Sequence, residues 1–131
     1  MIGLDTNVLV RYLTRDDAVQ YAKARRLIDD AVERDERLLV CSVVLCEVAW
    51  VLEAAYGYSR AEIAEAIERM LHTAQFEVER APEARQALED FRTTKAGFAD
   101  ALIGRLSRTL GARHTATFDR ALKPLDTFSV L

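Results

Sequence analysis

The sequence contains few of the residues that usually mark thiol, zinc or nucleotide sites. Of its 131 residues only two are cysteines and two are histidines. Cys41 and Cys46 have neither a metal-ligand nor a C-x-x-C spacing, so we expect both to be reduced, buried small hydrophobes in a cytoplasmic protein. His72 and His114 form no pattern with the acidic residues, and we expect them on the surface or in a strand. Glycine motifs of the P-loop or dinucleotide type are missing, so no nucleotide cofactor is indicated.

Long apolar runs and targeting signals are also missing. The longest apolar run, Leu38 to Leu52, carries Glu47 at its centre and does not resemble a membrane span. The first residues lack the basic region of a signal peptide. No repeat, low-complexity segment or linker interrupts the chain. We therefore expect residues 1–131 to fold as a single soluble domain with no membrane contact.

Charge is distributed unevenly along the chain, although its formal net value is only −3. Residues 27–91 hold fifteen acidic and six basic residues, whereas residues 92–123 hold seven basic residues against Asp100 and Asp119. Residues 1–26 are also basic on balance. Basic ends around a small group of carboxylates suit a polyanion that needs a metal, although a charge block is more often a solvated face.

Hydrophobic periodicity predicts strands that alternate with helices. This order indicates an α/β fold with a mostly parallel sheet of four or five strands, covered on both faces. Expected strands are 2–4, 38–41, 76–79, 114–118 and 127–131. Expected helices begin near residue 6 and cover 16–34, 42–56, 59–71, 82–93 and 97–110, with inward residues Val19, Ala22, Leu27, Ile28 and Ala31 in the second and Ala99, Leu102, Ile103, Leu106 and Leu110 in the last.

Four carboxylates stand where a carboxylate is unusual. Asp5 ends the first strand, at the edge where open α/β sheets bind ligands, and Thr6 and Asn7 can cap the helix that follows. Glu47 lies among apolar neighbours, and an isolated buried carboxylate must be protonated, paired or bound to a metal. For Asp5 the alternative is a plain helix cap, and for Glu47 a structural salt bridge with an arginine.

Asp100 and Asp119 complete the set. Asp100 falls in the first turn of its helix at the rim of the buried face, and Asp119 ends a strand as Asp5 does. A plain N-terminal charge and a helix cap are the alternatives for these two. Oxygen ligands without histidine or cysteine suit Mg²⁺ or Mn²⁺, so the four carboxylates are candidate metal ligands.

The segments that carry these carboxylates resemble a PIN domain, and more narrowly the VapC toxins of bacterial toxin–antitoxin pairs. The resemblance implies a three-layer α/β/α fold and a metal-dependent endoribonuclease whose acidic quartet is Asp5, Glu47, Asp100 and Asp119, with Thr6, Asn7 and Thr117 as a hydrogen-bonding surround. It also implies a homodimer and a small VapB-like antitoxin whose C-terminal segment crosses the active-site groove. The matching segments are Leu4-Asp5-Thr6-Asn7-Val8-Leu9, Cys46-Glu47-Val48-Ala49-Trp50, Gly97-Phe98-Ala99-Asp100-Ala101-Leu102-Ile103 and Thr117-Phe118-Asp119-Arg120-Ala121-Leu122.

The working hypothesis is hydrolysis of RNA with Mg²⁺ or Mn²⁺ at the quartet. Asp5 and Asp100 are the first-choice ligands, and Glu47 is a ligand or a general base. A doubly wound, metal-dependent phosphatase is one alternative. Such enzymes usually have a second acidic residue two positions after the first, and here that position is Asn7. An inactive PIN-like module that binds RNA or protein is the other. Basic residues expected to hold the RNA backbone are Arg11, Arg15, Arg105 and Arg120.

Overall fold

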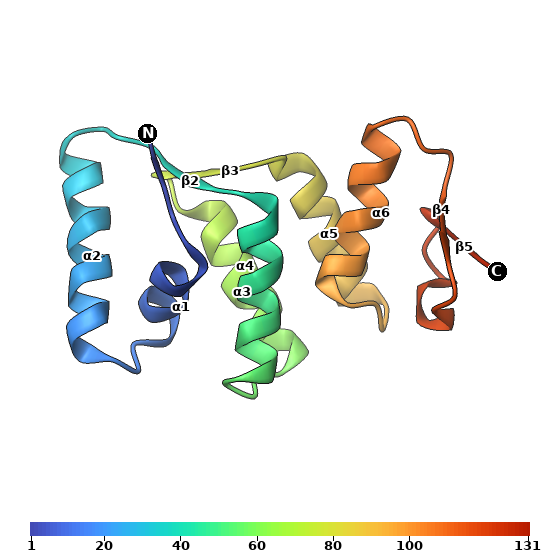
Figure 1. Ribbon diagram of the computed structural model, residues 1–131, viewed down its shortest axis with the longest axis horizontal. Coiled ribbons are helices and arrows are strands. Elements are labelled where there is room, and N and C mark those ends of the chain that lie inside the picture. Colours follow the sequence, from blue (N-terminus) through green and yellow to red (C-terminus); the bar gives the residue numbers. More distant parts are fainter. The chain divides into compact units, whose positions relative to one another are not determined.

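The computed structural model describes all residues from Met1 to Leu131 as two compact units, Met1–Glu79 and Arg80–Leu131. Every strand and helix expected from the sequence is present, with ends shifted by a few residues at most (Figure 1). Along the chain the elements are β1 (Ile2–Gly3), α1 (Thr6–Thr14), α2 (Ala18–Glu33), β2 (Leu38–Val40), α3 (Ser42–Ala54), α4 (Arg60–His72), β3 (Phe76–Val78), α5 (Ala81–Thr93), α6 (Phe98–Thr109), β4 (Thr115–Thr117), the 3-10 helix η1 (Arg120–Leu122) and β5 (Phe128–Val130). None of the helices combines the length and apolar character needed to cross a membrane.

All strand pairs are parallel, as expected. In the first unit β1, β2 and β3 form a three-stranded sheet in that order, with Ile2 opposite Leu38 and Leu38 opposite Phe76. In the second unit β4 pairs with β5, and Thr115 lies opposite Phe128. The five expected strands thus occur in parallel sheets of three and two strands. The α/β class is confirmed.

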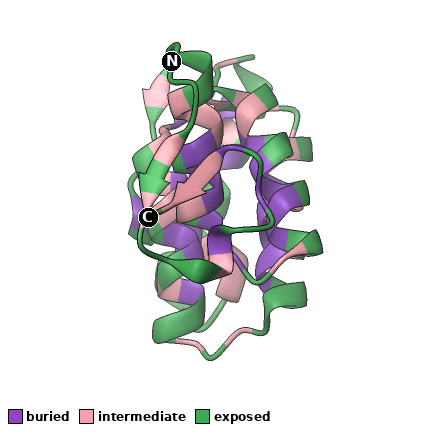
Figure 2. Cartoon of the chain, turned by 90° about the vertical axis from the view of Figure 1, so that its right-hand side faces the viewer, coloured by how far each residue is buried: buried purple, intermediate pink, exposed green.

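The hydrophobic core of the first unit consists of apolar side chains from its helices and from β2. Leu9, Leu38, Leu45, Leu52 and Ile67 are fully buried. In Figure 2 the helical ribbons carry buried and exposed residues on different sides. Removing such side chains from water is the main favourable term in folding.

In this unit, the end of α3 and the start of α4 lie where the local sequence signals predicted them. Ser59 and Glu62 form the capping box of α4, and Gly57 adopts a left-handed φ of 65° after α3. The expected inward face of α2 was wrong at its start, because Val19 is 66% exposed and Ala22 is exposed, whereas Ala24, Ile28 and Ala31 are buried.

The buried stripe of α6 also differs from the expected one. Phe98, Ala101 and Leu102 are buried, whereas Ala99 is exposed, Ile103 is 49% exposed and Leu110 is 79% exposed. The physical reason is an ion pair. Arg105 occupies the next position of the inward stripe, and both its Nε and Nη2 donate to the buried carboxylate of Asp90 on α5 at 2.8 Å. Counting arginine as an outward residue therefore shifted the expected stripe around the helix.

Gly104 permits the close approach of the C-terminal segment to α6. A Cβ atom at this position would lie 2.6 Å from Thr127 Oγ1 and 2.6 Å from Phe128 Cε2, closer than any side chain tolerates. Thr127 is 1% exposed, and Phe128 packs against the cluster of Ala96, Leu122 and Leu125. The glycine thus positions the segment that pairs with β4.

Candidate active site

Asp5 stands where the first strand of the sheet ends and α1 begins. Its Oδ1 accepts a hydrogen bond from the Thr6 backbone N–H at 2.8 Å, so Asp5 itself is the N-cap of α1. The expectation that Thr6 and Asn7 cap this helix was wrong, because both lie within its first turn. The Asp5 residue is exposed, and its Oδ2 has no protein partner. The cap therefore orients the carboxylate and leaves one oxygen free.

Thr6 is buried beside this carboxylate, at 7% exposure. Its Oγ1 atom is buried and has no hydrogen-bond partner. Buried hydroxyl groups are usually satisfied, so this one marks a polar position that the protein alone does not use. Asn7, the next member of the implied surround, is exposed.

Glu47 lies in the middle of α3 and is exposed, so the expectation that it is a buried carboxylate was wrong. Its neighbours one turn away on the same side, Val43 and Trp50, are each 69% exposed. The helix buries Leu45, Val48 and other residues of the opposite side instead. Glu47 forms no salt bridge, so the alternative of a structural pair with an arginine finds no support either.

Asp100 and Asp119 interact electrostatically within the second unit. Asp100 is half-buried in the first turn of α6, as expected. Burial, and then the nearby charge of Asp119, raises the pKa of Asp100 above its ordinary value. Asp119 is exposed after β4 and caps η1, because its Oδ1 accepts from the Ala121 N–H at 2.9 Å. Thr117 holds this turn, since its Oγ1 accepts from the Asp119 N–H at 3.0 Å.

The four carboxylates share one property: none forms a salt bridge with a lysine, arginine or histidine. Asp5 and Asp119 each use one oxygen in a cap and keep the other free. Neither Asp100 nor Glu47 accepts a hydrogen bond from the protein through its carboxylate oxygens. Each unit contains two of the four, and neither unit by itself gathers three acidic, histidine or cysteine side chains that could hold a metal ion.

Two of the four arginines expected to hold RNA are engaged by acidic side chains of the protein. Arg11 Nη1 contacts Asp16 Oδ2 at 3.0 Å, and Arg105 binds Asp90 through two nitrogens. Arg15 lies over the ring of Tyr21, 4.9 Å from its centroid. Arg120 alone among the four forms no ion pair or ring contact. Arg11 and Arg105 are thus paired within the protein, and their contact with RNA stays a prediction.

The histidines are exposed, whereas the two cysteines are less buried than the sequence indicated. Cys41 and Cys46 are free and half-buried, and burial raises the pKa of the Cys46 thiol. A thiol with a raised pKa is a poor nucleophile at neutral pH. His72 and His114 are exposed, and His72 contacts only the backbone oxygen of Glu68.

Comparison with known proteins identifies the family. The PIN domain model matches residues 2–127. The chain belongs to the PIN-domain family. It is also similar to a protein named VapC ribonuclease from Aquifex aeolicus (strain VF5), with 27% identity over 122 residues, which cover 93% of this chain and 90% of the relative. No solved structure matches the chain. The expected resemblance to PIN domains, and with it the PIN-like α/β fold, is confirmed.

Proposed function

We propose that this PIN-domain protein is a metal-dependent endoribonuclease and the toxin of a toxin–antitoxin pair. The observation that carries the proposal is the state of Asp5, Glu47, Asp100 and Asp119, which have no cationic partner in the protein. The resemblance of their segments to PIN domains assigns these four residues to the acidic quartet. The similarity to a VapC ribonuclease supports both the RNA substrate and the antitoxin partner.

The chemistry of the donor set fits Mg²⁺ or Mn²⁺. All available donors are carboxylate oxygens, the ligands that these hard cations prefer. Burial, and then the repulsion between Asp100 and Asp119, raises the pKa of Asp100, and a divalent cation would offset that repulsion. When bound, the ion lowers the pKa of a water molecule and offsets the charge that develops on the phosphate.

The residues take different parts in this mechanism. Asp5 and Asp100 are the proposed direct ligands, and Asp119 is a further ligand or holds a water molecule through its free Oδ2. Glu47 has two free carboxylate oxygens, either to serve as a ligand or to accept the proton of the attacking water as a general base. The caps on Asp5 and Asp119 hold these side chains in place before substrate binds, so little ordering is needed during the reaction.

We also propose that residues 1–131 work as one domain. Each of the two compact units carries only half of the acidic quartet, so neither half would hold the metal alone. The family model spans residues 2–127 and thus includes both units.

The test is cleavage of a panel of structured and single-stranded RNAs by the purified protein, in Mn²⁺ and in EDTA. Cleavage within the RNA chain that stops in EDTA supports the proposal. Metal-dependent hydrolysis of a phosphomonoester without RNA cleavage would identify a phosphatase instead. RNA binding without cleavage in Mn²⁺ would identify an inactive binding module.

Metal-free Asp100→Asn is expected to melt higher than metal-free wild type near pH 7. Because the folded pKa of Asp100 is raised, the ionised carboxyl destabilises the fold as pH rises above about 4, and the penalty is complete above the folded pKa. Partial exposure screens the charge, so we expect a gain of up to about 1 kcal/mol and a rise of up to about 4 °C in thermal melts.

The same melting curves with Mn²⁺ distinguish a ligand from a plain helix charge. Added Mn²⁺ should stabilise wild type more than Asp100→Asn, because the ion binds the folded wild type better. If Asp100 serves only the N-terminus of α6, the variant melts lower than wild type, and Mn²⁺ shifts both equally.

We further propose that the protein forms a homodimer and that a small antitoxin inhibits it by placing an arginine among the carboxylates. A guanidinium group pairs with carboxylates through two hydrogen bonds and would compete with the metal. Static light scattering at tens of micromolar protein should give twice the monomer mass of 14.8 kDa. A monomer under these conditions would contradict the dimer.

A further inference from the structure

A groove between α1 and α2 begins two residues after Asp5 and is lined by none of the four candidate metal ligands. Its volume is about 370 Å³, within the range of small-ligand pockets. Val8, Ala24 and Leu27 form its apolar floor, and Asn7 lines it in the first turn of α1. We call it the α1–α2 groove. A ligand in this groove would lie beside the helix end that carries Asp5.

The polar lining of the groove is cationic or neutral, in a chain whose net charge is −3. Lys23 and Arg11 line it, and no carboxylate does. Lys23 is exposed and has no ion pair or hydrogen bond, so its charge is available to a ligand. Asn7 and Gln20 add carboxamide groups to the same lining. The groove therefore fits a ligand with a flat apolar part and a negative charge. The apolar floor would contact the flat part, and the free ammonium group of Lys23 would pair with the charge.

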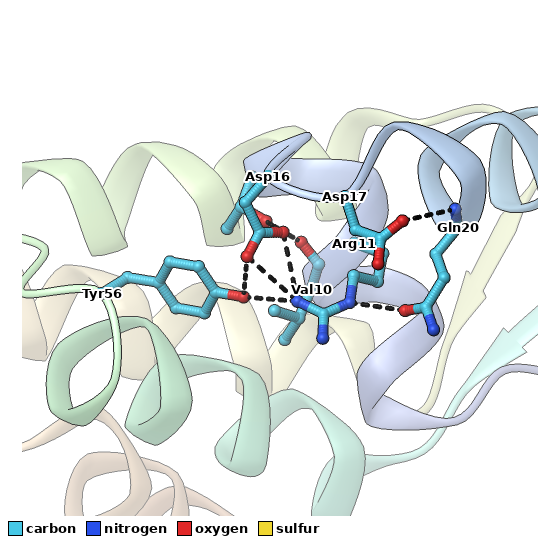
Figure 3. Close-up of polar contacts among 7 residues, drawn as sticks. Val10, Arg11, Asp16, Asp17, Gln20 and Tyr56 are labelled. Carbon is cyan, nitrogen blue, oxygen red and sulfur yellow. Dashed lines mark hydrogen bonds and ion pairs between the residues drawn. The ribbon is translucent and has the colours of Figure 1, made fainter.

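Hydrogen bonds hold the end of the groove at Arg11 and Gln20 in place. Arg11 Nε donates to Gln20 Oε1 at 2.6 Å, and Arg11 Nη1 donates to Tyr56 Oη at 2.7 Å and to Asp16 Oδ2 at 3.0 Å (Figure 3). Tyr56 Oη in turn donates to Asp16 Oδ2 at 2.7 Å.

This network also determines which donors remain. Arg11 Nη2 and Gln20 Nε2 have no hydrogen-bond partner in the protein. Arg11 is paired with Asp16, whereas Lys23 has no acidic partner and supplies the unpaired positive charge of the groove. Because the donors are fixed before a ligand arrives, little side-chain freedom is lost on binding.

We propose that the α1–α2 groove binds one nucleotide of the RNA, next to the phosphate that is cut; this inference rests on the proposed ribonuclease function. The base lies against the apolar floor with its edge toward the free amide and guanidinium donors, and Lys23 contacts a phosphate. An apolar segment of a protein partner would also fit the floor. The cationic lining without a carboxylate favours the nucleotide over that segment.

Lys23→Ala and Arg26→Ala form a matched pair to test this site. Both residues are exposed cations on α2, but only Lys23 lines the groove. In Mn²⁺, Lys23→Ala should raise KM for a single-stranded RNA about five- to tenfold and leave kcat within about twofold. The slope of log(kcat/KM) against the logarithm of the salt concentration should become shallower by about 0.7, because one phosphate contact is lost. Arg26→Ala should change KM by less than about twofold, and Lys23→Arg should restore it.

The possible failures can be told apart. If wild type cleaves RNA and Lys23→Ala matches Arg26→Ala, the ribonuclease proposal stands and the nucleotide site is refuted, which leaves a protein segment as the occupant. A fall in kcat at unchanged KM in Lys23→Ala would also refute it, because Lys23 would then act on the reaction step. If wild type cleaves no RNA in Mn²⁺, the proposed function itself fails.

Discussion

Asp5→Asn and Asp100→Asn are each expected to lower RNA cleavage in Mn²⁺ by at least about a hundredfold, the loss seen when one preorganised electrostatic group is removed from an active site. Both substitutions keep the size of the side chain and remove the charge that attracts the cation. Asparagine at position 5 can still accept the hydrogen bond from the Thr6 N–H, so α1 keeps its cap. The loss should therefore arise from the missing charge and not from unfolding.

Glu53→Gln is the control for these two variants. Glu53 is an exposed carboxylate on α3, outside the acidic quartet, and its neutralisation should leave cleavage within about twofold of wild type. Initial rates on one RNA, with Mn²⁺ titrated for each variant, measure the effect, and melting curves verify the fold. Cleavage at the wild-type rate by either aspartate variant would refute the ligand assignment, and cleavage in EDTA would refute the metal mechanism.

Arg105→Ala is expected to lower the free energy of unfolding by about 3 kcal/mol and the melting temperature by about 10 °C. The substitution leaves the Asp90 carboxylate, which is 6% exposed, without the guanidinium that binds both of its oxygens. A buried charge without a partner costs far more than the loss of an exposed ion pair. Denaturant and thermal unfolding of wild type and variant measure this cost.

Arg108→Ala is the matched control, because Arg108 lies three residues further along α6 and pairs with the exposed Asp126. Its loss should cost less than about 1 kcal/mol. The double variant Asp90→Ala, Arg105→Ala should be more stable than Arg105→Ala alone, since it removes the stranded charge. If Arg105→Ala melts like wild type and raises only KM for RNA, Arg105 holds RNA, as the sequence first indicated, and the structural role is refuted.

The order of the elements and the places of Asp5 and Asp100 could be predicted from the sequence because they depend on local signals. A short apolar run that breaks at a polar residue marks the end of β1 and thus the position of Asp5. Ser59 with Glu62 marks the start of α4, and Asp100 follows Gly97 into the first turn of α6. Each signal involves residues a few positions apart, and their hydrogen bonds form whatever the rest of the chain does.

The tertiary structure alone decided which cations are free. Arg11 donates a hydrogen bond to Tyr56, forty-five residues away in the sequence, and Arg105 donates to Asp90, fifteen residues away on the neighbouring helix. No spacing in the sequence announces such pairs, because they depend on which side chains packing brings within hydrogen-bond reach. The same contacts leave Lys23, which the sequence did not single out, as the free cation of the α1–α2 groove.

Helix orientation is the other property that only the tertiary structure decided. The sequence by itself determined that α3 and α6 are helices with apolar residues, but periodicity gives only relative angles around an axis. In α3, which is apolar on nearly every side, that left Glu47 apparently buried, whereas packing exposes it with Val43 and Trp50. In α6 the ion pair of Arg105 with Asp90 rotates the buried stripe away from Ile103. Local hydrogen bonds thus decide where a helix begins, and the partner it packs against decides which face it buries.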